Sequence, residues 1–253
     1  MKILAVTQAR TNSTRLPAKI FLKVGSESIL DIHLGRLKKS TRLTGIIVAT
    51  TTREEDARVC DVARAHGVSC YRGSEDDVLD RYYQAVKSLA PGYVVRVTSD
   101  CPLVDPVLID QVISRTLETQ ADYCSNVLVE TFPDGQDIEV FKFTALEKAW
   151  KEATLTSERE HVTPYIRKNA DFNGGNLFKA VSVKAAKNYG NLRMTLDESA
   201  DFELISHLVE KLGTGRTWQE YAEYLTSNKS ITGLNDHIQR NEGYAKSIKQ
   251  EDK

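Results

Sequence analysis

The sequence has no long hydrophobic run, and this absence excludes several classes of protein. No apolar stretch among the 253 residues approaches the roughly 18 that a membrane span requires. The apolar start, Met1 to Val6, is too short for a signal peptide, and Arg10 follows it closely. We therefore expect a cytoplasmic protein without a membrane partner.

Cysteine is scarce as well. No two of the four cysteines have the C-x-x-C spacing that is typical of structural zinc sites; they are Cys60, Cys70, Cys101 and Cys124. Their low density in a chain of this length argues against a disulfide framework. The sequence therefore predicts reduced thiols. Cys101 is expected to be a packed, unreactive thiol, because no histidine or other base is placed to activate it.

Three motifs that are common in nucleotide sites are missing. Neither a Walker A motif nor a G-x-G-x-x-G fingerprint occurs, which excludes the two phosphate loops that are easiest to recognise. The chain also has no Asp-x-Asp triplet of the kind that holds a metal beside a nucleotide sugar. A phosphate site in this chain must therefore be built from other residues.

What the sequence does have is a basic N-terminal segment. The net charge is only −1, from 34 basic and 35 acidic residues, but residues 1–45 carry nine Lys or Arg against two Asp or Glu. This excess indicates a small anionic ligand, and we expect no nucleic-acid partner. The solvated end of a helix accounts for Arg36, Lys38, Lys39 and Arg42. It does not account for Arg10, Arg15 and Lys19.

Strand and helix patterns alternate through the chain. Short apolar runs that are typical of buried parallel strands lie at 3–6, 45–50, 68–71 and 93–97. Apolar residues at helical spacing follow these runs, for example in 29–37 and 109–117. Later helices are expected at 144–152, 157–169 and 205–212, and later strands at 178–183 and 192–196. This order predicts an α/β fold with a mainly parallel sheet covered by helices on both faces.

The loop after the first strand has the side chains needed to bind a triphosphate. It contains Arg10, Arg15 and Lys19, together with hydroxyl groups and small residues that allow close backbone approach. A loop in this position lies at the carboxyl edge of the sheet, where such folds bind ligands. Arginine forks and a lysine ammonium are suited to phosphate oxygens. A basic surface loop is the alternative interpretation.

Two aspartates follow predicted strands and face the same edge. Asp100 comes directly after the strand at 93–97, and Asp197 comes directly after the strand predicted at 192–196. Mg²⁺ in nucleotide sites is usually held by one or two carboxylates and by phosphate oxygens. The sequence therefore predicts Asp100 and Asp197 as Mg²⁺ ligands. The alternative role is helix N-capping, which Asp105 fits better than Asp100 does.

These motifs together resemble a known family, the cytidylyltransferases that activate acidic sugars (the CMP-sialic acid and CMP-Kdo synthetases). The chain is similar to its A-R-x-x-S-x-R-L-P-x-K signature, to its D-x-P element and to its late R-x-T-x-D-x-x-x-D-[FY] element. The matching segments are 9–19, 100–102 and 193–202. The resemblance is strongest to the branch called spore coat polysaccharide biosynthesis protein F, through 132–139, 157–163 and 240–242.

The resemblance implies a Rossmann-like nucleotide-diphospho-sugar transferase fold and a CTP-dependent reaction. In that reaction a sugar hydroxyl attacks the α-phosphate, and pyrophosphate leaves. Arg10, Lys19 and Asp100 would be catalytic, with Mg²⁺ on Asp100 and Asp197. The nucleotide would be bound by Gln8, Ala9, Arg10, Ser13, Arg15, Lys19, Arg81 and Ser99. The acidic sugar would be bound by Asp134, Gln136, Asp137, Glu139, Arg159 and His161.

Other functions remain to be weighed. A glycosyltransferase on the same fold is the main alternative, and the missing Asp-x-Asp motif counts against it. A nucleotide-binding regulator without activity is a third possibility, and the complete set of basic and acidic site residues argues against it. For His161, a helix-surface or dimer-contact role competes with sugar binding. His33 is expected to be structural, because it falls on the apolar face of a helix.

The resemblance also guides the expected organisation of the chain. We expect a nucleotidyltransferase domain over 1–215, with a central sugar-binding and dimer segment at about 121–185. Residues 216–253 would form a C-terminal helical extension that docks on the core or serves a dimer. A homodimer is expected through an arm at 143–175, with Tyr165, Ile166 and Phe172 as possible contacts. Cover for the chain's own sheet is the alternative role of this arm.

Overall fold

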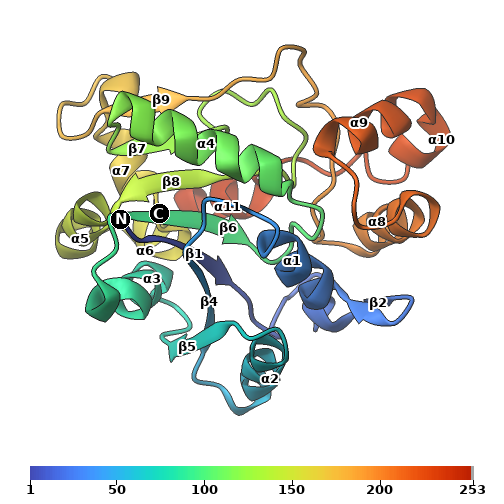
Figure 1. The fold of residues 1–253 in the computed structure, drawn as a ribbon, viewed down its shortest axis with the longest axis horizontal. Coiled ribbons are helices and arrows are strands. Elements are labelled where there is room, and N and C mark those ends of the chain that lie inside the picture. Colours follow the sequence, from blue (N-terminus) through green and yellow to red (C-terminus); the bar gives the residue numbers. More distant parts are fainter. Residues whose placement is uncertain (252–253) are drawn as a thin grey trace.

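A seven-stranded sheet forms the centre of the molecule, in the order β5-β4-β1-β6-β8-β7-β9 (Figure 1). The computed structural model describes residues 1–251, the side chains of Lys246 and Gln250 excepted. The strands of this sheet are β1 (Ile3–Gln8), β4 (Gly45–Thr51), β5 (Ser69–Gly73), β6 (Tyr93–Thr98), β7 (Tyr123–Ser125), β8 (Glu139–Lys142) and β9 (Ala180–Ser182). A separate hairpin is made by β2 (Lys23–Val24) and β3 (Glu27–Ser28).

The first half of the sheet is parallel, as the apolar runs predict. β1 pairs in parallel with both β4 and β6, and β4 pairs in parallel with β5. The second half changes direction, because β8 runs antiparallel to both β6 and β7. The carboxyl ends of β1, β4 and β6 therefore meet at one edge of the sheet. The loop after β1, which carries Lys19, and the loop after β6, which carries Asp100, both leave from this edge.

Helices cover both faces of the sheet. They are α1 (Ile29–Leu37), α2 (Ala57–Ala65), α3 (Val78–Val86), α4 (Pro106–Thr119), α5 (Phe143–Glu152), α6 (Thr156–His161), α7 (Pro164–Lys168), α8 (Ser199–Leu212), α9 (Trp218–Ser227), α10 (Lys229–Thr232) and α11 (Glu242–Glu251). Successive side chains of a strand point to opposite faces, so a strand covered on both faces is apolar throughout. In β1, Ile3 and Ala5 join the core that includes α1, α4 and α8. Leu4 and Val6 join the core that includes α3 and α5.

Two predicted elements are different in the structure. The prediction of a strand at 192–196 is wrong. This segment forms only a single bridge, between Arg193 and Asp134, because its backbone N–H groups bond to two different loops. Met194 N donates to Asp134, whereas Leu196 N donates to Asp100. The helix expected at 157–169 is divided into α6 and α7 at Val162, whose φ is +72°.

The C-terminal helices continue the core. Trp218, Tyr221 and Leu225 of α9 are buried in the same core as α4 and α8, so this part of the chain docks on the sheet layer. α11 then returns to the middle of the molecule and packs against α6 (Figure 1). No helix among the described residues has the length and apolar composition that crossing a membrane requires.

The prediction of four reduced thiols is wrong for two of them. Cys60 of α2 and Cys70 of β5 form a disulfide, with their Cα atoms 5.4 Å apart. The turn at Gly67 folds α2 back along β5, and this brings the two residues within disulfide range although their spacing of ten carries no motif. Cys101 and Cys124 are free and buried, so the prediction of a packed Cys101 is confirmed.

Candidate active site

Lys19 is the centre of a polar cluster at the carboxyl edge of the sheet. It begins a short 3₁₀ turn after the loop that follows β1. Its ammonium Nζ donates to Asp100 Oδ2 at 3.1 Å, to Asp197 Oδ1 at 2.9 Å and to the Leu196 carbonyl at 2.6 Å. Burial lowers the pKa of Lys19, but the two carboxylates more than offset this and raise it. Lys19 therefore stays charged in a site where its side chain is only 12% exposed.

The two aspartates predicted as metal ligands lie together. Asp100 follows β6, and its backbone carbonyl accepts hydrogen bonds from Leu196 N and Thr195 Oγ1. These bonds attach the loop after β6 to the segment that carries Asp197. Burial raises the pKa of Asp100, but Lys19 and a hydrogen bond from Thr98 lower it to about 2. The Asp100 carboxylate is therefore ionised at any physiological pH.

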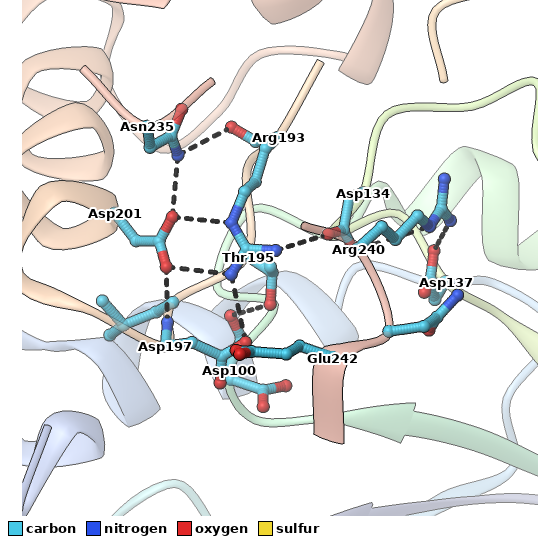
Figure 2. A network of polar contacts seen from close by, with 12 residues as sticks. Asp100, Asp134, Asp137, Arg193, Thr195, Asp197, Asp201, Asn235, Arg240 and Glu242 are labelled. Carbon is cyan, nitrogen blue, oxygen red and sulfur yellow. Dashed lines mark hydrogen bonds and ion pairs between the residues drawn. The ribbon is translucent and has the colours of Figure 1, made fainter. Parts of the chain in front are cut away.

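Arg193 connects Asp197 with the predicted sugar-binding residues (Figure 2). Its guanidinium forms a two-pronged pair with Asp201, with Nε and Nη2 at 2.8 and 3.0 Å from the two carboxylate oxygens. It also donates to Asp134 Oδ2 at 2.7 Å and to Asp197 Oδ2 at 3.1 Å. Asn235 supports Asp201 from the C-terminal segment, at 2.8 Å. One arginine thus fixes three carboxylates, two of which belong to the predicted site.

Arg240 enters the same cluster from the C-terminal segment. Its Nη2 lies 2.6 Å from Asp137 Oδ1, and its Nη1 donates to the Phe132 carbonyl at 3.2 Å (Figure 2). Its Nε lies near Asp134 and Glu130 without a hydrogen bond. Burial, together with the neighbouring carboxylates, raises the pKa of Asp137 to about 7, although Arg240 counteracts this.

The other residues predicted to bind the nucleotide lie at the ends of neighbouring strands or in the loops that follow them. Gln8 and Ser99 are linked by a backbone hydrogen bond between β1 and the end of β6. Ala9 is buried, and its N–H donates to Ala49 of β4. The Gln8 side-chain oxygen is buried and has no hydrogen-bond partner among the described residues. A buried acceptor without a protein partner is one that a bound ligand can satisfy by supplying a donor.

The basic residues of the first loop divide into two groups. Arg15 is near the Lys19 cluster, 3.0 Å from both Asp197 and Glu242. Arg10 is 47% exposed and lies 3.9 Å from Glu75, on the side of the loop where Arg81 is also found. Arg81 is buried and donates to the Ser74 carbonyl, so it holds the loop that carries Glu75. Ser13 closes a turn of the loop through a hydrogen bond to Thr11.

The predicted sugar residues also separate. Asp134 and Asp137 belong to the cluster already described. Gln136 is buried, and its amide bonds to Asp105 N and to the Leu103 carbonyl, both at 2.9 Å. Glu139 is buried between Arg96, Tyr123 and Thr163. The side chains of Gln136 and Glu139 are therefore used in internal contacts.

Arg159 and His161 lie on α6, beside α11. Arg159 pairs with Asp77 at 2.7 Å and donates to two backbone carbonyls, so its charge is already neutralised. His161 Nε2 lies 3.1 Å from the Ser247 hydroxyl, and its ring packs edge-on against Tyr244. The structure thus places His161 against the C-terminal helix and gives Arg159 a role in holding α6 to the segment before α3.

The structural role expected for His33 is confirmed. Its ring is buried, with Nδ1 3.0 Å from the Cys101 carbonyl and Nε2 2.9 Å from the Thr7 hydroxyl. Burial lowers the pKa of His33 to about 4, so the ring is neutral. His33 therefore connects the end of β1 with the loop that presents Asp100. Asp105 caps α4, as predicted, by accepting from Val107 N.

Sequence reasoning did not identify Arg193, Asp201 or Arg240 as members of the cluster. Arg193 and Asp201 both belong to the late motif. They are eight residues apart on either side of the start of α8, and this spacing is the feature that could have indicated their pairing. Arg240 belongs to the segment 240–242 that carries the resemblance, but nothing in the sequence indicates that it meets Asp137, 103 positions away. Only the folded chain brings it there.

Comparison with known proteins agrees with this geometry. The family model described as Cytidylyltransferase matches residues 4–231. An uncharacterized protein of Methanocaldococcus jannaschii is 40% identical over 95% of this chain and 97% of its own length. The spore coat polysaccharide biosynthesis protein SpsF of Bacillus subtilis is 32% identical over 83% of this chain and 88% of its own length.

A solved structure shares the whole fold. A cytidylyltransferase from Leptospira borgpetersenii superposes with a TM-score of 0.87 and 33% identity, and the match covers 95% of this chain and 100% of that one. The sequence matches and this superposition extend over most of the chain, and the family model includes the loops that carry Lys19, Asp100 and Asp197. The fold is the Rossmann-like nucleotide-diphospho-sugar transferase fold. The chain belongs to the cytidylyltransferase family and is a CTP-dependent nucleotidyltransferase.

Proposed function

We propose that the protein transfers CMP from CTP to a hydroxyl group of an acidic sugar for a surface polysaccharide, with Mg²⁺ and with release of pyrophosphate. The observation that carries this proposal is the position of Lys19 between Asp100 and Asp197, with Arg15 beside them. Cations for a triphosphate and carboxylates for a metal are thus present in one place. The motifs shared with the acidic-sugar cytidylyltransferases support the choice of acceptor.

The residues present fit a magnesium ion. Asp100 and Asp197 both turn an oxygen toward the same cation, the Lys19 ammonium, and the low pKa of Asp100 keeps it ionised. The described residues contain no group of three His, Cys, Asp or Glu arranged for a metal. Mg²⁺ suits this arrangement, because it binds through one or two carboxylates and takes its other ligands from phosphates and water. The ion would neutralise phosphate charge and polarise the acceptor hydroxyl.

The chain's own residues would position the reactants. Lys19 and Arg15 would bind the triphosphate and stabilise the charge that develops as pyrophosphate leaves. Arg10 would contact the outer phosphates from the exposed side of the loop. Gln8 would accept a hydrogen bond from the nucleotide through its unpartnered side-chain oxygen. Arg193 would keep Asp197 aligned, since it holds that carboxylate and Asp201 at the same time.

On the acceptor side, Asp134 and Asp137 would orient sugar hydroxyls. Both carboxylates are held in place by an arginine, Asp134 by Arg193 and Asp137 by Arg240. Groups fixed in this way lose little conformational freedom when a substrate binds, which is how an active site positions a nucleophile. Asp134 and Asp137 are far from Lys19 in the sequence. The backbone bridge between Asp134 and Arg193 brings them near it, because Arg193 and Lys19 both bind Asp197.

The experiment that tests this function is pyrophosphate release, with four nucleoside triphosphates crossed against a panel of acidic ketosugars, with and without Mg²⁺. Release with CTP and one acidic sugar, dependent on Mg²⁺, is the expected result. Release with a neutral sugar alone would overturn the choice of acceptor. Binding of a nucleotide sugar without any CTP turnover would favour a glycosyltransferase instead.

We further propose that the enzyme acts in the cytoplasm as a homodimer. Of the three residues expected at the dimer arm, Ile166 is buried in the chain's own core, whereas Phe172 is 44% exposed. Leu177, two residues beyond the end of this arm, is also 44% exposed. Sedimentation velocity would test the dimer: a monomer at micromolar concentration would contradict it, and Phe172→Ser should weaken a dimer that uses this arm.

A further inference from the structure

A second charged cluster lies beside the site, on the sheet face covered by α3 and α5. Its centre is the buried carboxylate of Glu139, which lies directly across from Arg96 in the antiparallel pair of β8 and β6. Arg96 Nη1 donates to Glu139 Oε2 at 2.5 Å. The Tyr123 and Thr163 hydroxyls donate to Oε1 at 2.5 and 2.6 Å. Glu139 is therefore fully engaged, while Arg96 Nε is buried without a partner among the described residues.

A second arginine joins this cluster without a partner of its own. Arg167 is one helical turn beyond Thr163, as its N–H bonds to the Thr163 carbonyl at 2.9 Å. Side chains four apart on a helix share a face, so Arg167 lies toward Glu139, and its charge interacts with Glu139, Arg96 and Tyr244. Its guanidinium forms no hydrogen bond or ion pair with the side chains and backbone that the structure describes, and the residue is half-buried.

The cluster therefore carries more positive than negative charge. Arg96 and Arg167 face the single carboxylate of Glu139. Burial lowers the pKa of His161, which favours its neutral form, so this ring does not add to the positive charge. Glu160, at the outer side of α6, is 44% exposed and receives a hydrogen bond from Ser247. Burial lowers the pKa of Arg167, but Tyr123, Glu139 and Tyr244 more than offset this and raise it, so the guanidinium stays charged and can donate to an anionic ligand.

The position of the cluster connects it to the nucleotide site. Arg96 pairs with Val6 across β6 and β1, and two residues farther along, Thr98 pairs with Gln8. Alternate residues share a sheet face, so Arg96 and Gln8 lie on the same face, about 7 Å apart along the strands. α11 begins with Glu242 beside Arg15 and continues over His161 through Tyr244. One helix thus passes from the phosphate-binding loop to the arginine cluster.

We propose that Arg96 and Arg167 form the subsite that receives the carboxylate of the acidic sugar, under the cover of Tyr244. This rests on the proposed function and assigns the recognition of the acid to residues that the motifs did not indicate. Arg159, which was expected to meet the carboxylate, is neutralised by Asp77. Arg96 holds Glu139 through Nη1 and would donate to the sugar carboxylate through Nε. Arg167 would supply a guanidinium that is not paired with any other described residue.

The test is the dependence of pyrophosphate release on the acceptor. Wild-type enzyme is assayed with CTP and with each of two acids, 3-deoxy-manno-octulosonic acid and N-acetylneuraminic acid, and with the carboxamide of each. Arg167→Gln should raise KM for the accepted acid by about 10- to 100-fold, since a charge-assisted hydrogen bond is lost. KM for CTP should stay within about twofold, and the preference for acid over carboxamide should largely disappear. Arg167→Lys should restore part of the affinity for the acid and part of the preference for acid over carboxamide.

Arg159→Gln is the matched control, because it removes an arginine from the neighbouring helix whose charge is paired. It should lower thermal stability and leave the preference for acid over carboxamide unchanged. Arg167→Gln should lower thermal stability less than Arg159→Gln does, since the Arg159 guanidinium is ion-paired with Asp77 and that of Arg167 has no ion pair among the described residues. An Arg167→Gln enzyme that loses stability but keeps the acid preference would overturn the subsite alone. A wild-type enzyme that turns over CTP but accepts the carboxamide as well as the acid would overturn the acidic acceptor, and the subsite with it.

Discussion

Lys19 holds Asp100 and Asp197 at the same time, so its replacement acts on two carboxylates at once. In Lys19→Met the side chain keeps its length and loses its charge. We expect kcat/KM for CTP to fall at least about 100-fold, in the range seen when one stabilising group is removed from a phosphoryl or acyl transfer site. The magnesium concentration for half-maximal rate should not rise, because the two carboxylates lose a competing cation.

The measurement is pyrophosphate release over a range of magnesium concentrations. Asp100→Asn provides the comparison, since it removes a proposed metal ligand and leaves Lys19 in place; its response to magnesium should be lost while the fold stays intact. Lys19→Arg should retain part of the activity. Full turnover by Lys19→Ala would contradict the triphosphate role.

His33 makes the stability of the protein depend on pH in a predictable direction. Its pKa is lowered from the ordinary 6.5 to about 4, because the ring is fully buried. Between these two values the unfolded chain binds a proton that the folded chain does not, so stability is complete above pH 6.5 and declines as the pH falls to about 4. The decline amounts to about 1.4 kcal/mol per pH unit, or roughly 3 kcal/mol in all.

Urea unfolding of wild type and His33→Gln at several pH values isolates this effect, because the other titrating groups are common to both proteins. The advantage of wild type over the variant should be larger at pH 7 than at pH 5. A difference in unfolding free energy that is the same at both pH values would contradict a buried neutral histidine.

At the scale of elements, Gly135 keeps the loop of Asp134 against the segment of Arg193. Its φ is +97°, and a Cβ at this position would lie 2.5 Å from the Met194 carbonyl carbon. Alanine there must move two backbone segments apart. We expect Gly135→Ala to lose about 2–4 kcal/mol of stability, from the left-handed backbone and from the clash together. It should also reduce turnover, because Asp134 and Arg193 separate.

Gly174→Ala is the matched control for this substitution. Gly174 also has a positive φ, of +82°, but a Cβ there would meet nothing within 4 Å. It should cost about 1 kcal/mol and leave turnover unchanged. Chemical denaturation and initial rates measure both effects. Equal losses of stability in the two variants would show that the contact with Met194 does not matter.

The elements that the sequence predicts well are those whose pattern is local. Ile29, Leu30, His33, Leu34 and Leu37 indicate a helix at 29–37, and α1 spans Ile29–Leu37. The four parallel strands are found for the same reason, since each is a continuous apolar run. Asp100 and Asp197 can be brought together by reasoning about strand ends, even though 192–196 does not form a strand. Asp197 lies at the carboxyl edge of the sheet because Leu196 N bonds to the Asp100 carbonyl there, and not because its segment pairs as a strand.

The parts that could not be predicted depend on contacts between distant residues. Arg240 reaches Asp137 only after α8, α9 and α10 have packed and returned the chain to the site. Arg193 appears in a motif, but nothing local shows that its guanidinium binds three carboxylates. Arg159 looks like a free cation until α6 is placed against Asp77. In each case the partner is chosen by tertiary packing, for which spacing along the chain carries no signal.

For the molecule as a whole, the C-terminal segment completes a site that the N-terminal half begins. Arg15 and Glu242 are 227 positions apart and lie 3.0 Å from each other. Ser157 is bound by Glu251 at the far end of the same helix. Residues 240–251 therefore link the loop after β1, the carboxylate of Asp137 and α6. The family match ends at residue 231, so this link lies outside the region that the family model describes.

The Cys60–Cys70 disulfide joins α2 to the edge strand β5, two strands away from β1 and its site loop. Closing a loop with a sequence separation of 10 should contribute about 2–3 kcal/mol by restricting the unfolded chain. Reduction should therefore lower the unfolding free energy by that amount, while kcat and KM for CTP stay the same. A Cys60→Ser, Cys70→Ser variant should resemble the reduced protein and show no response to reductant.

Thiol counting tests the oxidation state directly. Denatured without reductant, the purified protein should expose two thiols, those of Cys101 and Cys124, and after reduction it should expose four. Four thiols in the unreduced sample would contradict the disulfide. Disulfides are rare in cytosolic proteins, where thioredoxin and glutathione keep thiols reduced. Protein taken from cells with thiols blocked at lysis, compared with protein oxidised in air, therefore shows whether α2 and β5 are joined where the enzyme works or only after purification.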